Sequence, residues 1–161
     1  MPPEFRTERL FAAPRETVWD AWTIPDQLAQ WMGPKGSTSE SVTADIRTGG
    51  MHHWRMDMPG GGAMYGRADY REVTPPSRLV WVHGFADAEG NRVAMPFAEN
   101  WPLTMLTIVT FAEEGEGTRV VLTWAPLDAS AVEEQVFADN IPSMTGGWNG
   151  SFEQLDEFLA R

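Results

Sequence analysis

Apolar and polar residues along this chain change their spacing twice, and the changes divide the chain into three parts. In the first part, "EFRTERLFAA" at residues 4–13 alternates and predicts a strand. Pro14 then opens "PRETVWDAW", where a proline in the first turn favours a helix. The next stretch, "TIPDQLAQWMGPKG", predicts a second short helix that stops at Gly33-Pro34. The chain therefore begins as one strand followed by two short helices.

Between Ser41 and Pro126 the spacing becomes alternating, which is the period of strands. The strands predicted in this part span residues 42–47, 50–58, 63–73, 78–85, 103–112 and 118–125. Clusters of Gly and Pro separate them, so the returns are short and neighbouring strands are expected to be antiparallel. With the first strand they make a sheet of about seven strands.

Helical spacing returns in the last part of the chain. Its apolar residues recur every three or four positions and form one stripe, made of Ile141, Met144, Trp148, Phe152, Leu155 and Leu159. The helix is predicted over about residues 143–160, and Pro142 and Gly146-Gly147 are expected to kink or interrupt its first part. A helix of this kind must bury its stripe on the sheet. We therefore expect an α+β fold, a curved antiparallel sheet with two short helices and a long C-terminal helix, in a single domain over residues 1–161.

Composition excludes several classes of partner. The formal net charge of −11 argues against nucleic acid and against anionic membrane surfaces, because both need clustered Lys and Arg. No apolar run approaches the roughly 20 residues of a membrane span, and "MPPEFRTERLF" lacks the features of a secretory signal, so a cytoplasmic protein is expected. The chain has no cysteine, which excludes disulfides and thiolate chemistry. Its 8 Trp, 9 Met and 8 Phe suit either a heavy core or a lined cavity.

The stretch "GGMHHWRMDMPGGG" at residues 49–62 holds two adjacent histidines on a predicted strand. Neighbouring residues of a strand point to opposite faces, so His52 and His53 cannot both bind one metal. One face is charged and is expected to form a solvated cross-strand ladder with the next strand, made of His53, Arg55, Asp57, Arg67, Asp69 and Arg71. The other face is apolar and is expected to turn toward the helix, and it carries His52, Trp54 and Met56.

His52 and His83 are the histidines expected to point inward. A zinc site needs three or four converging ligands, and the apolar faces carry no Asp or Glu, so no metal site is expected. Two interpretations stay open for each ring: a core histidine satisfied by a hydroxyl, a backbone group or water, or a polar handle in an apolar ligand cavity. A proton-transfer role would need an orienting carboxylate, which no inward position supplies. No catalytic residue is therefore assigned, and no P-loop or G-x-S-x-G motif indicates a cofactor or a nucleophile.

The excess of aromatic residues also has two interpretations. An apolar stripe is ordinary core in most helices, but a long helix on a strongly curved sheet leaves a concave apolar space of the kind that binds small molecules. The predicted lining of such a cavity is His52, Trp54, Met56, Tyr70, Trp81, His83, Met105, Met144 and Trp148. The connection at residues 86–103 is expected to be either a lid over the opening, with Phe97 and Trp101 as its apolar contacts, or a simple hairpin extension.

Several segments resemble, in the right order, one known superfamily. They are "FAAPRETVWDAWTIPDQLAQWMGP", "DIRTGG", "YREVTPPSRLVWV", "LTIVTF", "GTRVVLTW" and "MTGGWNGSFEQLDEFL", and together they cover essentially the whole chain. The chain is similar to the activator-of-heat-shock-protein-ATPase-like branch of the SRPBCC superfamily, whose members are START-like, birch-pollen-allergen-like helix-grip domains. The resemblance implies a cavity between the sheet and the terminal helix. Members of the superfamily bind lipids, hormones or polyketides, and some are cyclases or hydroxylase components.

The inward residues and the resemblance together predict a protein that binds a small hydrophobic or aromatic ligand without a cofactor, with the histidines and Tyr70 orienting its polar groups. A cyclase- or isomerase-type enzyme that uses a cavity histidine as acid or base is one alternative. An interaction module, either a chaperone regulator or a homodimer, is another. The name-giving chaperone activators carry an additional N-terminal domain for chaperone contacts, whereas this sequence starts directly in its first strand. A chaperone partner is therefore the less favoured expectation.

Overall fold

The structure is a computed structural model that describes residues 2–95 and 98–161. Within these residues, seven strands and four helices follow one another along the chain. They are β1 (Phe5–Phe11), α1 (Arg15–Thr23), α2 (Pro25–Leu28), β2 (Thr38–Ala44), β3 (Met51–Asp57), β4 (Ala63–Thr74), β5 (Arg78–Ala86), β6 (Met105–Glu114), β7 (Gly117–Pro126), α3 (Ala131–Asp139) and α4 (Ile141–Leu159). The predicted α+β class and order of elements are confirmed, and α3 is an additional short helix before the terminal one.

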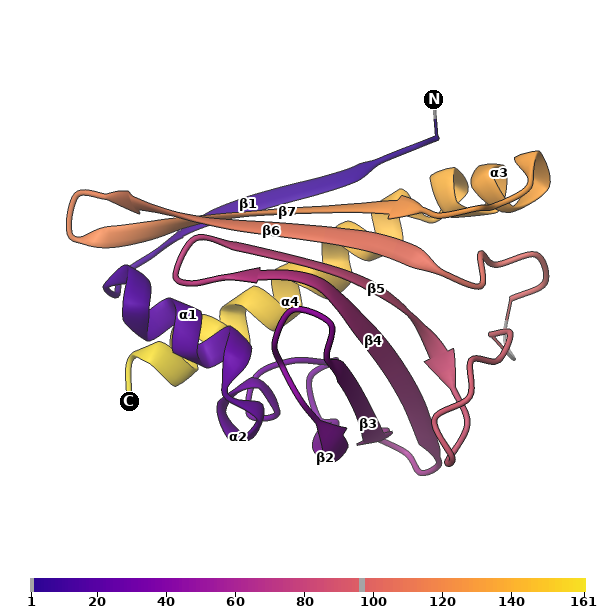
Figure 1. The fold of residues 1–161 in the computed structure, drawn as a ribbon, viewed down its shortest axis with the longest axis horizontal. Helices are drawn as coiled ribbons and strands as arrows, with labels where there is room; N and C mark the ends of the chain where they lie inside the picture. The colour runs from indigo at the N-terminus through magenta and orange to yellow at the C-terminus, as the bar shows by residue number, and fades with distance from the viewer. Residues whose placement is uncertain (1, 96–97) are drawn as a thin grey trace.

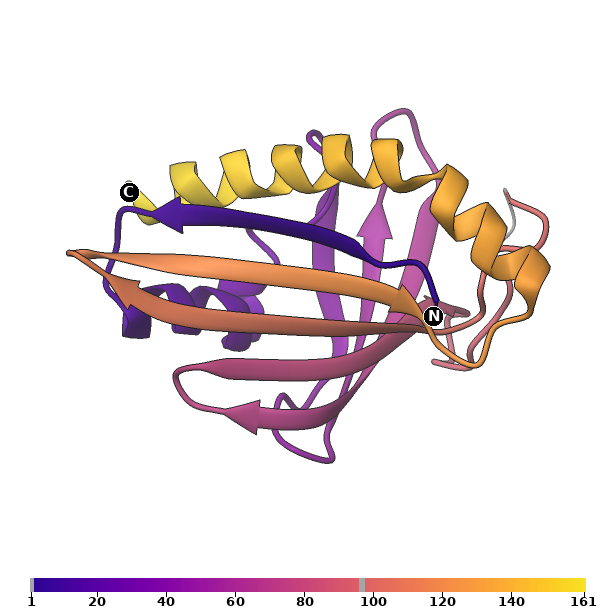
Figure 2. The ribbon, with the colours of Figure 1, turned by 90° about the horizontal axis from the view of Figure 1, so that it is seen from above.

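The described strands form one antiparallel sheet in the order β1-β7-β6-β5-β4-β3-β2. Strands β3, β4 and β5 run in a different direction from β1, β6 and β7, and α4 lies behind the sheet in this view (Figure 1). Figure 2 shows α4 running alongside β1, and the helix packs against β1, α1 and α3. The sheet is thus strongly curved, and its concave face holds the core.

Trp22 of α1 lies at the centre of this core. Its indole is stacked on that of Trp148 of α4, with an interplanar angle of 10° and ring centroids 6.1 Å apart. It also lies edge-on to Trp31 and Phe111, at 4.7 and 5.8 Å. Such aromatic pairs contribute about 0.5–1.5 kcal/mol each beyond the area they bury. The cluster therefore ties the first helix, the last helix and the sheet together.

The C-terminal helical stretch is interrupted at Asn140, just before Pro142, as expected from sequence, but Gly146-Gly147 do not interrupt it, contrary to that expectation. The break between α3 and α4 falls at Asn140, and Pro142 occupies the first turn of α4, where its missing N–H is not needed. The two glycines lie on the outer side of the helix, with nothing within 4 Å of a Cβ placed there. The helix continues through them because its opposite side is buried on the core, and such packing supplies most of a helix's stability.

The β2 strand runs over Thr38–Ala44 rather than the predicted 42–47. It is an edge strand, exposed over most of its length, and its register on β3 shifts between Ser41 and Thr43. Its sequence therefore carries no regular alternation that could mark where the strand begins.

The connection from α2 to β2 is held against α4 by side chains of the helix. Gln154 Nε2 donates to the carbonyl oxygens of Trp31 and Gly33, at 3.2 and 2.7 Å. Ser151 Oγ donates to the same Gly33 carbonyl at 3.3 Å. These contacts place α2 and the start of β2 beside the concave face of the sheet.

The turn before β3 gives a test of this fold. A Cβ at Gly50 would lie 1.9 Å from the carbonyl oxygen of Asp45, so Gly50→Ala should lower the free energy of unfolding by about 1–3 kcal/mol. Gly147→Ala on the outer side of α4 is the matched control and should raise it by about 0.5–1 kcal/mol, because alanine favours the helix. Urea denaturation followed by circular dichroism measures both. A Gly50 variant as stable as the wild type would contradict this close approach of the two backbone segments.

Candidate functional site

A cavity of about 100 Å³ lies between the sheet and α4. The helices and the segment after α2 contribute Trp22, Leu28, Ala29, Met32 and Trp148 to its wall. The inner strands contribute His52, Trp54, Ala68, Tyr70, Trp81, His83 and Trp124, and β2 adds Ser39, Glu40 and Ser41 at the edge. The wall is therefore mostly aromatic, with a few polar groups set into it.

Strand register brings the inward residues of three strands into one row. His52 of β3 lies opposite Ala68 of β4, and Ala68 lies opposite His83 of β5. Neighbouring strands are about 4.8 Å apart, so the two histidines flank Ala68 from either side. In the next row Tyr70 of β4 lies opposite Trp81 of β5. The small side chain of Ala68 leaves the floor of the cavity open between these larger groups.

Trp54 lies against the sheet beside this row because the residue opposite it is Gly66. A Cβ at Gly66 would come within 2.2 Å of the Trp54 indole. The glycine therefore makes room for the ring, which forms part of the cavity wall at the end of the sheet nearest β2.

Each inward histidine has one ring nitrogen bonded to a hydroxyl. Nε2 of His52 is 2.9 Å from Oγ of Ser41, and Nδ1 of His83 is 3.0 Å from Oγ1 of the buried Thr107. The second nitrogen of each ring and the hydroxyl of Tyr70 make no hydrogen bond to the part of the chain that the structure describes. Each ring is therefore bonded to a hydroxyl on one side, as expected of a core histidine, and its second nitrogen has no partner among the described residues.

Burial keeps both imidazoles uncharged at neutral pH. Loss of solvation lowers the pKa of His52 to about 4, with a smaller effect from the neighbouring His53. It lowers the pKa of His83 to about 3, with a smaller effect from Arg92. Burial also raises the pKa of the Tyr70 hydroxyl, which therefore stays a hydrogen-bond donor. At neutral pH each ring is therefore a neutral hydrogen-bonding group rather than an imidazolium.

Three residues of the wall each carry a buried polar atom that has no partner among residues 2–95 and 98–161. These atoms are Nε1 of Trp22, Nε1 of Trp124 and Oγ of Ser39. The indole of Trp31, by contrast, donates to the carbonyl oxygen of Ala21 at 2.8 Å. A buried polar atom left unpaired costs about 1–3 kcal/mol. A buried polar atom without a protein partner is usually bonded to water or to a bound group, and Arg15, Arg92 and Trp101 carry such atoms away from the cavity.

Residues 2–95 and 98–161 contain neither a metal-binding cluster nor a membrane-spanning helix. There, no group of three or more His, Asp or Glu side chains could hold a metal ion. No described helix is both long enough and apolar enough to cross a membrane.

The structure places most, but not all, of the predicted lining residues on the cavity wall. Those on the wall are His52, Trp54, Tyr70, Trp81, His83 and Trp148. Met56 lies toward Gly33 instead, and Met105 and Met144 are buried in the core.

Sequence reasoning missed the contributions of α1, α2, β2 and β7 to the wall. Alternation along β7, where Val120 and Leu122 are buried, could have identified Trp124 as an inward residue. An apolar stripe marks Leu28 and Met32 around α2 as inward residues, whereas no local signal marks those of β2, and the place of both segments depends on the contacts with α4 described above.

His53 points away from the cavity, as the alternation indicates, but the expectation that it is solvated is wrong. Only 3% of its surface is exposed. Its Nε2 lies 3.0 Å from the carbonyl oxygen of Asp87, and its ring lies close to Gly90. The connection that follows β5 folds back over this outer face of the sheet and covers the histidine.

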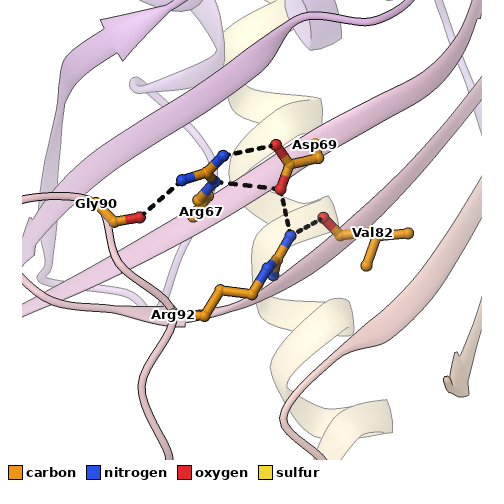
Figure 3. Close-up of polar contacts among 5 residues, drawn as sticks. All are labelled: Arg67, Asp69, Val82, Gly90 and Arg92. Atoms are coloured by element: carbon orange, nitrogen blue, oxygen red, sulfur yellow. Dashed lines mark hydrogen bonds and ion pairs between the residues drawn. The ribbon is translucent and has the colours of Figure 1, made fainter. Parts of the chain in front are cut away.

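The expectation of ion pairs between neighbouring strands on this face is also wrong. Arginine and aspartate pair within the same strand instead. Arg55 and Arg67 each pair with the aspartate two positions further along the same strand, at 3.0 Å. Arg92, from the connection after β5, also pairs with Asp69, and Arg67 donates to the carbonyl oxygen of Gly90 at 3.0 Å (Figure 3). Figure 3 shows this cluster on one side of the sheet with α4 on the other. The cluster fastens the connection to the outer face.

Trp101, the predicted lid residue that the structure describes, lies away from the cavity wall. Its ring packs against Phe137 of α3, with centroids 5.9 Å apart. Phe97 lies outside the described residues. The part of the connection around Asp87 and Gly90 therefore lies on the outer face of the sheet, whereas Trp101 packs against the core beside α3.

The lowered pKa values predict a fold that is sensitive to acid. A histidine in an unfolded chain titrates near pH 6.5, whereas His52 and His83 titrate near pH 4 and pH 3 in the fold. Between these values the unfolded state binds more protons, so the free energy of unfolding should fall as the pH drops from about 6.5 toward 4. The double variant His52→Gln/His83→Gln should show a shallower fall, because glutamine does not titrate. Urea midpoints at neutral pH and in mild acid measure this, and parallel pH profiles for the two proteins would refute it.

Comparisons with known proteins agree with this geometry. A family model described as "Activator of Hsp90 ATPase homolog 1-like protein" matches residues 12–160. The comparison with curated proteins found no match. Among solved structures, protein Ms6760 from Mycobacterium smegmatis is 27% identical, with a TM-score of 0.78 over 97% of this chain and 90% of that one.

Two further structures show the same fold. A protein from Arthrobacter aurescens is 25% identical, with a TM-score of 0.81 over 98% of this chain and 86% of that one. Protein CV1439 from Chromobacterium violaceum is 24% identical, with a TM-score of 0.73 over 97% and 96% of the two chains. The resemblance stated from the sequence is thereby confirmed.

Proposed function

We propose that this chain, which belongs to the family of activator-of-Hsp90-ATPase-homolog-1-like proteins, binds a small uncharged aromatic molecule in the cavity between the sheet and α4. The fold of this family is of a ligand-binding type. The observation that carries this proposal is the cavity itself, whose aromatic wall surrounds polar atoms that have no protein partner. A few placed polar groups in an apolar pocket are the usual composition of a small-molecule site.

The size of the cavity limits the ligand to a single ring. Small-molecule pockets usually enclose about 300–1,000 Å³, and an apolar cavity of about 150 Å³ holds one benzene. The space of about 100 Å³ in this protein is therefore filled by at most one six-membered ring. A lipid chain or a polyketide would need a substantially wider cavity than this one.

The charge state of the wall limits the ligand further. With both imidazoles neutral and Tyr70 protonated, the inner wall offers hydrogen bonds but no counter-charge for an ion. Burying an unpaired charge costs far more than burying a neutral polar group. The free nitrogens of His52 and His83 and the hydroxyl of Tyr70 suit a neutral hydroxyl or carbonyl substituent on the ring.

The alternatives from the sequence have less support. An enzyme that uses His52 or His83 as its acid would need a protonated imidazole, which burial disfavours, and the same lowered pKa makes each ring a weaker base. An interaction module would show a continuous apolar patch, whereas the most exposed large apolar side chains among the described residues come from separate elements. They are Leu10, Ile24, Val42, Leu103 and Val132.

Ala68→Leu tests the cavity proposal, because the longer side chain would fill the floor between the histidines. We expect it to weaken the binding of phenol at least about tenfold, which corresponds to about 1.4 kcal/mol. Ala112→Leu is the matched control, since Ala112 is an exposed position on β6, and it should bind phenol like the wild type. Ligand-observed NMR titration measures both variants, and circular dichroism checks that they fold.

The same titration tests the charge of the ligand. Wild-type protein should bind phenol at least about tenfold more tightly than benzoate or benzylammonium, because neither ion finds a counter-charge inside. Equal affinity for benzoate, or full phenol binding by the Ala68→Leu variant, would overturn the proposed site.

A further inference from the structure

The cavity opens to the outside between α2 and β2. A wide depression of about 660 Å³ lies between these two elements and Arg161. Four residues line both this depression and the cavity: Ala29, Ser39, Glu40 and Ser41. The two spaces therefore adjoin one another at these residues, and we call the depression the outer groove.

The outer groove differs from the cavity in its chemistry. Where the cavity wall is aromatic, the outer groove is lined mainly by hydroxyl and amide side chains, among them Gln30, Ser37, Ser39 and Ser41. Ser39 and Ser41 face the cavity side of the sheet, because they lie opposite Met56 and Trp54 of β3 in the register. The groove therefore presents hydrogen-bonding groups directly next to the apolar opening of the cavity.

The charges around the outer groove do not favour an ion. Glu40 lies opposite Arg55 in the register, so its side chain shares the outer face of the sheet with that arginine. Arg161 already donates to Oε1 of Gln30 at 2.9 Å and lies over the ring of Phe158. Asp26 of α2 is an exposed residue of the opposite sign to Arg161 on the same rim. A neutral substituent therefore fits the groove better than an ion.

An unpaired hydroxyl lies at the junction of the two spaces. Oγ of Ser39 is buried and has no hydrogen-bond partner within the described parts of the chain. Other atoms of Ser39 line both the cavity and the outer groove, so this hydroxyl lies directly behind the wall that the two spaces share. A hydroxyl group on a bound molecule that passes through the opening would supply the missing bond.

We infer that the ligand has two parts: one aromatic ring held in the cavity, and an uncharged, hydroxyl-bearing substituent that passes between α2 and β2 and lies in the outer groove. This rests on the proposed function, since the groove receives the substituent only when the ring occupies the cavity. The chemical class is that of a single-ring aryl glycoside or aryl polyol. The polar groups of the outer groove distinguish such a molecule from the free ring.

Titration calorimetry with phenol, phenyl β-D-glucoside and 3-phenylpropionate tests this inference. The glucoside should bind the wild type at least about tenfold more tightly than phenol, because it adds several hydrogen bonds of about 0.5–1.5 kcal/mol each. The propionate should bind no more tightly than phenol, because Asp26 and Glu40 line the same groove as Arg161 and oppose the entry of a carboxylate.

Substitutions in and beside the outer groove test where the substituent of the ligand binds. Ser39→Ala should reduce the ratio of glucoside affinity to phenol affinity roughly threefold to tenfold, the effect of one lost hydrogen bond. Thr43→Ala, on the same strand but opposite His53 on the outer face, should leave that ratio at its wild-type value. Ala29→Trp should abolish glucoside binding, because the indole would close the opening.

The outcomes separate this inference from the proposed function. If phenol binds and the glucoside binds no more tightly, the outer groove is not a subsite, and the cavity proposal stands. If the propionate is preferred to the glucoside, the assignment of an uncharged substituent is overturned. If neither phenol nor the glucoside binds, both proposals fall.

Discussion

The curvature of the sheet relative to the straight α4 helix is the constraint on which the site depends. The helix packs against β1, α1 and α3, and Trp148 anchors it on Trp22. Strands β3, β4 and β5 curve away from this contact (Figure 1), so the segment around α2 and the edge strand β2 must complete the wall there. The aromatic side chains fill most of the space, and Ala68 in the floor leaves the remainder open as the cavity.

Successive side chains along β3, β4 and β5 point to opposite faces of the sheet, and the two faces carry different kinds of side chain. The inner face carries aromatic and neutral polar groups, because a charge placed there would lose its hydration without gaining a partner. The outer face carries the charged residues, and the pairing of Arg67 and Arg92 with Asp69 fastens the connection after β5 to it. His52 and His53 are adjacent in the chain and both buried, yet one lines the cavity and the other lies under that connection. The two adjacent histidines thus lie in separate environments and do not form one site.

The sequence predicted what depends on local periodicity. The period-two pattern located the strands around His52, Tyr70 and His83, and the helical stripe located Trp148. What it could not predict depends on contacts between distant segments. The burial of His53 requires the connection after β5 to return to β3, and the opening between α2 and β2 requires Gln154 of α4 to hold the segment at Gly33. Continuity of α4 through Gly146-Gly147 follows from packing, which overrides the low helix propensity of glycine.

The central claim is that a small uncharged ring occupies the space above Ala68. Intermolecular nuclear Overhauser effects between phenol and protein labelled with 13C at its methyl groups test this most directly. The account predicts contacts from the phenol ring to the methyl group of Ala68, between the two histidines. Phenol contacts confined to methyl groups on the outer face of the sheet, or no contacts at a saturating phenol concentration, would contradict it.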